Sequence, residues 1–141
     1  MIKRLLILLL LCQVALAGGD LDVRQGGSLW ARVESHGTIR LGGSLAGKFE
    51  SDGSVRKNGS LVGRVESDGT VRKNGSLFGE VESDGTLRIG GSLYGRIESD
   101  GTIRKSGSLW GRAEGVDGSF DDMRRVAAVL FFFAPDFGGG G

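Results

Sequence analysis

The side chains that could carry acid–base or metal chemistry recur at a fixed interval along this 141-residue chain. Asp52, Asp68, Asp84 and Asp100 each precede a glycine, and His36 takes the same place in the preceding copy. Regular carboxylates could bind calcium, but their spacing of 16 residues fits neither an EF-hand loop nor a calcium-binding β-roll. Aspartate before glycine is also what a tight turn needs. We therefore expect a turn role for these residues and no metal site.

The same inventory argues against an enzyme. His36 is the only histidine, which excludes a cluster of histidine metal ligands. It also takes the place of the usual turn aspartate, which argues against a histidine-based triad. Glu66 and Asp68 bring two carboxylates near each other, but such pairs recur as copies of one surface turn. General acid–base catalysis needs one positioned pair within reach of a substrate. The sequence predicts no catalytic residue and no cofactor.

One position varies from copy to copy and carries most of the large aromatic side chains of the repeats. It is occupied by Trp30, Ala46, Val62, Phe78, Tyr94 and Trp110. Strand parity places this position on the charged face of the sheet. We predict Trp30, Phe78, Tyr94 and Trp110 as candidate ligand-binding residues that stack on sugars or another planar ligand. The alternative is that they pack against neighbouring hairpins or the Phe-rich C-terminal segment.

These positions belong to a 16-residue repeat that fills most of the chain. The string Gly-Ser-Leu occurs six times, beginning at Gly27, Gly43, Gly59, Gly75, Gly91 and Gly107. Each copy carries an Asn-Gly-like turn signal and an Asp-Gly-like one. Turns this frequent leave no room for helices, so the repeats predict an antiparallel meander of β-hairpins.

The pairing that keeps apolar side chains on one face indicates three-residue loops at both turns. A loop over 67–69 sets Val65 opposite Val71, and a loop over 73–75 sets Val71 opposite Leu77. Gly79 then lies where the long strand changes partners, at the place where a bend is easiest. One bend per repeat predicts a sheet that closes into a ring and removes its own edges.

Period-2 alternation predicts an apolar face directed at the ring axis. This predicted core comprises Leu29, Leu45, Leu61, Leu77, Leu93, Leu109, Val33, Phe49, Val65, Val81, Ile97, Val23, Ile39, Val55, Val71, Leu87 and Ile103. The opposite face alternates arginine and glutamate. It is either a charged ring for an ion or an anionic polymer, or a solvated surface, because exposed ion pairs contribute only ~0–1 kcal/mol.

The repeats resemble the bacterial β-flower proteins, which are small exported proteins whose hairpin petals surround a pseudo-rotational axis. The resemblance is carried by SDGTVRKNGSLFG, IESDGTIRKSGSLWG and the closing RRVAAVLFFF, and it covers roughly residues 20–133. It implies an all-β, closed toroidal fold and no particular activity. The five-fold type is the most similar, yet this chain has six Gly-Ser-Leu copies. The sequence leaves open whether the ring has six petals or a terminal copy caps it.

The first 17 residues have the features of a secretory signal peptide. Lys3 and Arg4 precede the apolar run Leu5–Leu11, and Ala15-Leu16-Ala17 supplies the cleavage pattern. Cleavage removes the only cysteine, Cys12, and leaves 16 basic against 17 acidic residues. We expect an exported protein that is periplasmic, secreted or associated with the outer surface and that has no disulfide. A net charge of −1 gives no basic patch for nucleic acid.

Beyond the repeat domain of residues 18–120, residues 121–135 form an apolar segment. Two aspartates at its start, no internal glycine and a terminal proline favour a short helix, although the Phe run would also suit a strand. The segment is predicted to pack on the ring and plug or cover one opening. Residues 136–141 are Gly-rich and predicted to be disordered.

These observations predict an exported non-enzymatic repeat protein, a binding or structural module of the cell envelope. The sequence does not identify the ligand, and a polysaccharide or another cell-envelope component is a candidate partner. The alternative is an assembly component that contacts a membrane or partner through the apolar segment, or forms a homo-oligomer through residues 123–133.

Overall fold

The computed structural model describes residues 19–139, so the predicted signal peptide lies outside the described residues. Twelve antiparallel strands form one closed sheet, in which each strand pairs with its chain neighbours and β1 closes the ring against β12. The short strands are β1 (Leu21–Gln25), β3 (Thr38–Leu41), β5 (Ser54–Lys57), β7 (Thr70–Lys73), β9 (Thr86–Ile89) and β11 (Thr102–Lys105). The long strands are β2 (Ser28–Val33), β4 (Ser44–Phe49), β6 (Ser60–Val65), β8 (Ser76–Val81), β10 (Ser92–Ile97) and β12 (Ser108–Glu114).

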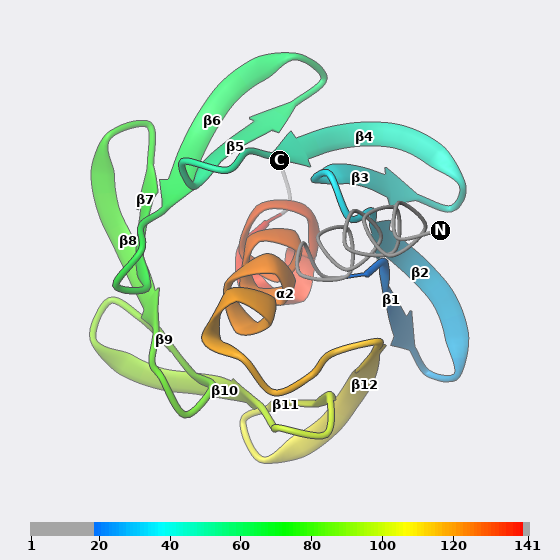
Figure 1. Ribbon diagram of the computed structural model, residues 1–141. Coiled ribbons are helices and arrows are strands. Elements are labelled where there is room, and N and C mark those ends of the chain that lie inside the picture. The colour runs from blue at the N-terminus through cyan, green and yellow to red at the C-terminus, as the bar shows by residue number, and fades with distance from the viewer. Residues whose placement is uncertain (1–18, 140–141) are drawn as a thin grey trace, which may run out of the picture.

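Each short strand and the long strand after it make one hairpin, and the hairpins surround a central helix (Figure 1). The predicted all-β closed ring is confirmed. All six copies are members of the ring, so the five-fold arrangement and the capping copy are both wrong for this chain. The closing β1–β12 pair sets Val23 opposite Ala113, which leaves no free sheet edge between the first and last copies.

The Asp-Gly turns have the predicted geometry. Val65 lies opposite Val71, and the Glu66 N–H donates to the Thr70 carbonyl at 2.7 Å, which leaves a three-residue loop over 67–69. Gly69 closes this loop with a φ of 97°, a left-handed conformation that glycine adopts without cost. Burying Val65 and Val71 on one face fixes this register, since a slip of one residue would bury Glu66 instead.

The Asn-Gly turns differ from the prediction. Lys73 pairs with Ser76, which leaves a two-residue loop whose Asn74 and Gly75 have φ values of 50° and 85°. Positive φ at both positions is the type I′ turn, whose twist matches that of the strands. The next pairs are Arg72 with Leu77 and Val71 with Gly79, so a β-bulge falls at Phe78. The predicted pairing of Val71 with Leu77 is wrong.

The bulge reverses the faces of the first half of every long strand. Leu77 points outward beside Arg72 and is 69% exposed, whereas Phe78 turns toward the ring interior. The remaining predicted core is buried, with Val33, Val65 and Val81 each at 0% exposure. The part of the core prediction that placed six leucines on the axis is therefore wrong.

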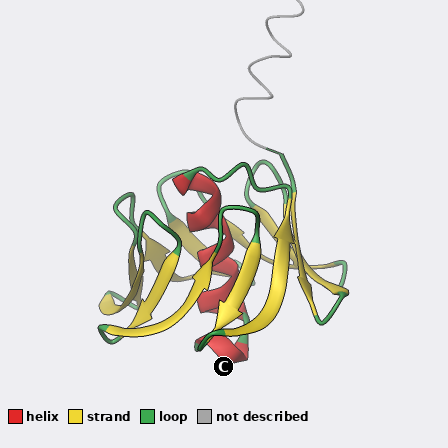
Figure 2. Ribbon diagram, turned by 90° about the horizontal axis from the view of Figure 1, so that it is seen from below, coloured by secondary structure: helices red, strands yellow, loops and turns green. Residues whose placement is uncertain are grey.

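The C-terminal segment forms the helix α2 (Phe120–Phe133), which runs along the ring axis (Figure 2). The predicted helix is confirmed, and it fills the ring interior rather than covering one opening. Ser119 caps its start by accepting from the Asp122 N–H at 3.2 Å. Val126, Leu130 and Phe131 are fully buried. Among the described residues, no helix is long and apolar enough to cross a membrane.

After Ala134, the short 3₁₀ helix η1 (Pro135–Phe137) turns across one end of the ring. It extends into residues for which the sequence predicts disorder, and Phe137 is fully buried. The two ends of the ring differ. The Asn-Gly turns and η1 lie at one end, here called the tip end, and the Asp-Gly turns and the start of α2 lie at the other, here called the acidic end (Figure 2).

Candidate functional site

The four predicted aromatic residues lie on the inner side of the sheet. The bulge in each hairpin turns this position away from the charged face, so the parity prediction is wrong for all four. All are half-buried and pack against the core that α2 and the strands form. From the sequence, these aromatics could either form a stacking platform for a ligand or pack within the protein. Their contacts in the structure are those of packing.

Three of these aromatics gather around η1 at the tip end. The ring of Trp110 lies edge-on to Phe137 at 5.3 Å and to Trp30 at 5.7 Å between centroids. Tyr94 contacts Phe137 from another side at 5.7 Å. Asp136 fixes the polar ends of the cluster, since its carboxylate accepts from Trp110 Nε1 at 2.8 Å and its carbonyl accepts from the Tyr94 hydroxyl at 2.7 Å. These bonds hold η1 across the opening.

Phe78 lies apart from this cluster, against α2. Its ring is edge-on to Phe131 at 5.7 Å, and the Lys73 ammonium lies 4.0 Å from its centroid. Lys73 also donates to the Gly138 carbonyl at 2.6 Å. Burial, with the nearby charge of Lys57, lowers the pKa of Lys73. The structure thus divides the predicted site between two packing clusters.

The most exposed large apolar side chains are the residues that the sequence assigned to the core. Leu29, Leu45, Leu61, Leu77, Leu93 and Leu109, here called the leucine rim, are between 49% and 69% exposed. Each is the second residue after its tip turn, so the six occupy equivalent places around the ring. Exposed apolar surface that recurs around one end of a molecule is typical of an interaction surface.

Grooves separate neighbouring hairpins beside the leucine rim. One groove of about 400 Å³ is lined by Leu29, Arg32, Glu34 and Arg40, and another of about 380 Å³ is lined by the equivalent residues two copies later, such as Leu61 and Arg72. Their floor carries the charged face, in which Arg72 Nε donates to Glu66 at 3.0 Å. The arginine–glutamate pairs are partly exposed, so they favour the solvated-surface interpretation over an ion site.

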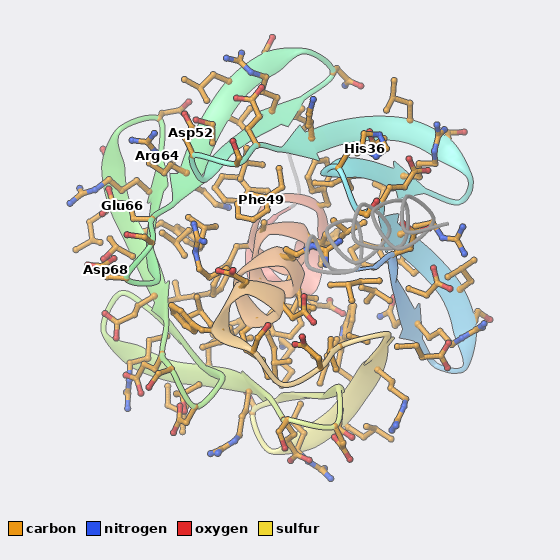
Figure 3. All side chains as sticks on the ribbon, viewed as in Figure 1. His36, Phe49, Asp52, Arg64, Glu66 and Asp68 are labelled. Carbon is orange, nitrogen blue, oxygen red and sulfur yellow. The ribbon has the colours of Figure 1, made fainter. Side chains whose placement is uncertain are left out.

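The turn aspartates serve the backbone, as the sequence predicts. Asp68 accepts from the Thr70 N–H at 3.0 Å, and the backbone and hydroxyl of Thr70 lower the pKa of Asp68. His36 bonds the Thr38 hydroxyl at 2.8 Å in the first copy. Asp52, Asp68 and His36 lie at separate turns, whereas Phe49 lies on the inner side (Figure 3). Within residues 19–139, no group of three or more potential ligands is placed to hold a metal ion.

A hollow of about 560 Å³ lies at the acidic end between α2 and the first two hairpins. The charged side chains that line it include two arginines of α2 that bind the helix to the ends of the strands. Arg124 donates to the carbonyls of Glu66 and Val65 at 2.9 and 2.7 Å. Arg125 donates to Glu34 O at 3.1 Å and pairs with Asp122 at 3.1 Å.

Sequence reasoning missed the structural role of these two arginines. The available signal was their place in the first turns of a helix, where the helix dipole disfavours cations unless other groups hold them.

The apolar segment proposed for homo-oligomerisation, residues 123–133, lies inside the ring. Met123, Val126 and Leu130 are at most 3% exposed, and Phe132 packs onto the backbone of Gly63. Assembly through this segment would require the helix to leave the ring.

The fold and the exposed surfaces define the class of the protein as a closed all-β ring of six hairpins, filled by its own C-terminal helix and carrying an outward leucine rim. Comparison with models of known protein families, with curated proteins and with solved structures finds no match to the chain. Its function is therefore argued from its own surfaces.

Proposed function

We propose that this chain is an exported, non-catalytic binding module of the cell envelope, a six-petalled member of the β-flower type that acts through its tip end. The observation that carries the proposal is the leucine rim, whose six equivalent side chains are between 49% and 69% exposed. A solvated surface gains nothing from leucine at the same place in every copy. A surface that binds a partner gains burial of each one.

The packing of the interior supports a binding role at the outside. α2 occupies the axis, where a ring protein would otherwise hold a ligand, and Leu130 and Phe131 are fully buried there. The aromatic cluster at the tip end is closed by Phe137 and Asp136. The outer surfaces stay open to a partner, and among them the leucine rim carries the exposed large apolar side chains.

Sedimentation with isolated cell envelopes tests the proposal. The mature protein is compared with a rim variant that carries Leu45→Asn, Leu61→Asn and Leu77→Asn. A matched control carries Ser51→Asn, Ser67→Asn and Ser83→Asn, which are exposed positions in the Asp-Gly turns of the same copies. We expect the mature protein and the control to sediment with the envelopes and the rim variant to stay in solution. Equal sedimentation of all three, or none, contradicts the proposal.

Recovery of the mature protein tests export separately. We expect the chain isolated from the periplasm or the medium to begin at residue 18, as measured by intact mass. A chain that keeps residues 1–17 inside the cell would contradict the exported part of the proposal.

A further inference from the structure

The leucine rim and the charges around it point to one class of partner. Resting on the proposed function, we propose that the tip end docks on an anionic lipid surface, with the leucine rim entering the boundary between head groups and acyl chains.

The tip turns are neutral or basic in all copies. The residues that precede the two-residue turns, each the last of its short strand, are Gln25, Leu41, Lys57, Lys73, Ile89 and Lys105, and the turn residues themselves are glycine, asparagine or serine. The acidic residue at this end is Asp136, whose carboxylate already accepts from Trp110 and Gln25. Lysine, leucine, isoleucine and small polar residues together are the composition of an interfacial surface.

The lysines add fixed positive charge around the opening of the ring. The ammonium groups of Lys57 and Lys105 lie 5.4 and 5.3 Å from the ring centroids of Phe133 and Tyr94. Lys73 lies over Phe78. These contacts hold the charges at the tip end, where they would face phosphate groups.

Acidic side chains gather at the opposite end. The Asp-Gly turns contribute Asp52, Asp68, Asp84 and Asp100, and Asp117 and Asp121 lie near the start of α2. Arg64, Arg96, Arg124 and Arg125 pair with carboxylates at this end, so the tip end, where lysines outnumber Asp136, is the more positive of the two. An anionic surface would favour the tip end, which sets one orientation of the ring. A neutral partner would have no such preference.

The depth of the leucines suits a lipid interface. Each is two residues from its turn, about 7 Å along an extended strand. Interfacial segments place their apolar face about 5–10 Å into the boundary region. Because the turns lie beyond the leucines at the tip end, they would enter the interface first, and the lysine stems beside them would reach back to the phosphate level. The arginine–glutamate pairs farther along the strands would stay in water. A second copy of the chain, the competing occupant of an apolar rim, would have to oppose tip end to tip end and so bring like charges together.

Vesicle sedimentation tests the inference with the mature protein, the rim variant and the Ser→Asn control. One vesicle set contains phosphatidylglycerol and phosphatidylcholine, and the other contains phosphatidylcholine alone. We expect the mature protein and the control to bind the anionic vesicles, with weaker binding to the neutral ones and at raised salt. The rim variant should bind at least about tenfold more weakly, because three buried leucines are lost. Thermal unfolding of each variant verifies that the ring is intact.

The outcomes separate the two proposals. Binding to cell envelopes without binding to either vesicle would overturn the lipid inference and leave the envelope-binding proposal standing. Binding to neither would overturn both. If the rim variant binds vesicles as well as the mature protein does, the inference is also overturned. It is overturned too if the mature protein binds no vesicles but forms a dimer in solution that the rim variant does not form.

Discussion

The ring of Phe132 lies so close to Gly63 that a Cβ built on that glycine would come within 2.6 Å of Phe132 Cε1. Gly63 is one of the inward glycines that follow the aromatic position, and the equivalent Gly47 meets Phe133 in the same way. The glycines therefore do more than ease a bend. Some of them leave the space into which the Phe run of α2 packs.

Gly63→Ala should destabilise the protein by about 1–3 kcal/mol, because the new methyl group overpacks the helix contact. A Cβ at Gly63 also meets the backbone carbonyl oxygen of Arg72, and a Cβ at Gly79 meets that of Arg88 in the same way, but the three atoms nearest to it include no helix side chain. Gly79→Ala is therefore the matched control for the backbone clash. The free energy of unfolding in denaturant should fall further for Gly63→Ala than for Gly79→Ala. Equal losses would mean that the helix does not determine the need for glycine at this position.

Neighbouring residues on β8 should respond in opposite ways to truncation. Leu77→Ala should change the free energy of unfolding by less than about 0.5 kcal/mol, because Leu77 is 69% exposed. Phe78→Ala should cost about 1–3 kcal/mol, since it removes a half-buried ring packed on Phe131. Denaturant unfolding of both variants measures the difference. A larger loss for Leu77→Ala would show that the bulge is absent and that the leucines face the axis.

The contrast between the two turns shows how far the sequence alone could lead. On either side of the Asp-Gly turn, Val65 and Val71 alternate with polar or charged residues along their strands. Only one loop length therefore keeps the apolar side chains on one face of the sheet. At the Asn-Gly turn, Leu77 and Phe78 are both apolar, and alternation cannot decide which of them faces inward. The dipeptide Asn74-Gly75 is itself a strong signal for a two-residue turn. A prediction that gave this turn signal more weight than the pairing of apolar residues would have included the bulge.

The sequence predicted that the C-terminal segment forms a helix, but it did not predict that the helix lies along the ring axis. Asp121, Asp122 and the proline after the Phe run indicated a helix, as observed. Its place along the axis depends on the inward glycines and on the bonds from Arg124 and Arg125 to strand-end carbonyls, which connect residues far apart in the chain. Such contacts leave no periodic pattern. The candidate aromatic site was misplaced for the same reason as the leucines, namely the bulge.

Acid should weaken the cap that holds the start of α2. Hydrogen bonds from Ser119 lower the pKa of Asp117 to about 2, below its unfolded value of 3.8. A lowered pKa means that the ionised form stabilises the folded state above the unfolded value and that this stabilisation is lost as the pH falls toward 2. Asp117→Asn removes this titration and keeps a hydrogen-bond acceptor.

We expect the mature protein to have a higher midpoint of thermal unfolding than Asp117→Asn at pH 6, with the gap closing between pH 4 and 2. Burial raises the pKa of Asp122, and the neighbouring Asp117 raises it further, so Asp122 has the opposite pH dependence and its pKa falls in Asp117→Asn. Melting curves followed by circular dichroism across this range provide the test. A gap that stays constant down to pH 2 would show that Asp117 does not stabilise the cap through its charge.

Tryptophan emission should report whether η1 closes the tip end. Trp110 contacts Phe137 at 5.3 Å and Trp30 at 5.7 Å, and both tryptophans are half-buried. Phe137→Ala removes the ring on which Trp110 packs, and Trp30 packs on Trp110 in turn, so the emission should shift to the red and acrylamide should quench it more readily. Phe120→Ala is the matched control, because Phe120 lies at the other end of α2 and should leave the emission unchanged. Unchanged emission in Phe137→Ala would mean that the tryptophans do not depend on η1, and a role for Trp30 and Trp110 in binding a planar ligand would regain support.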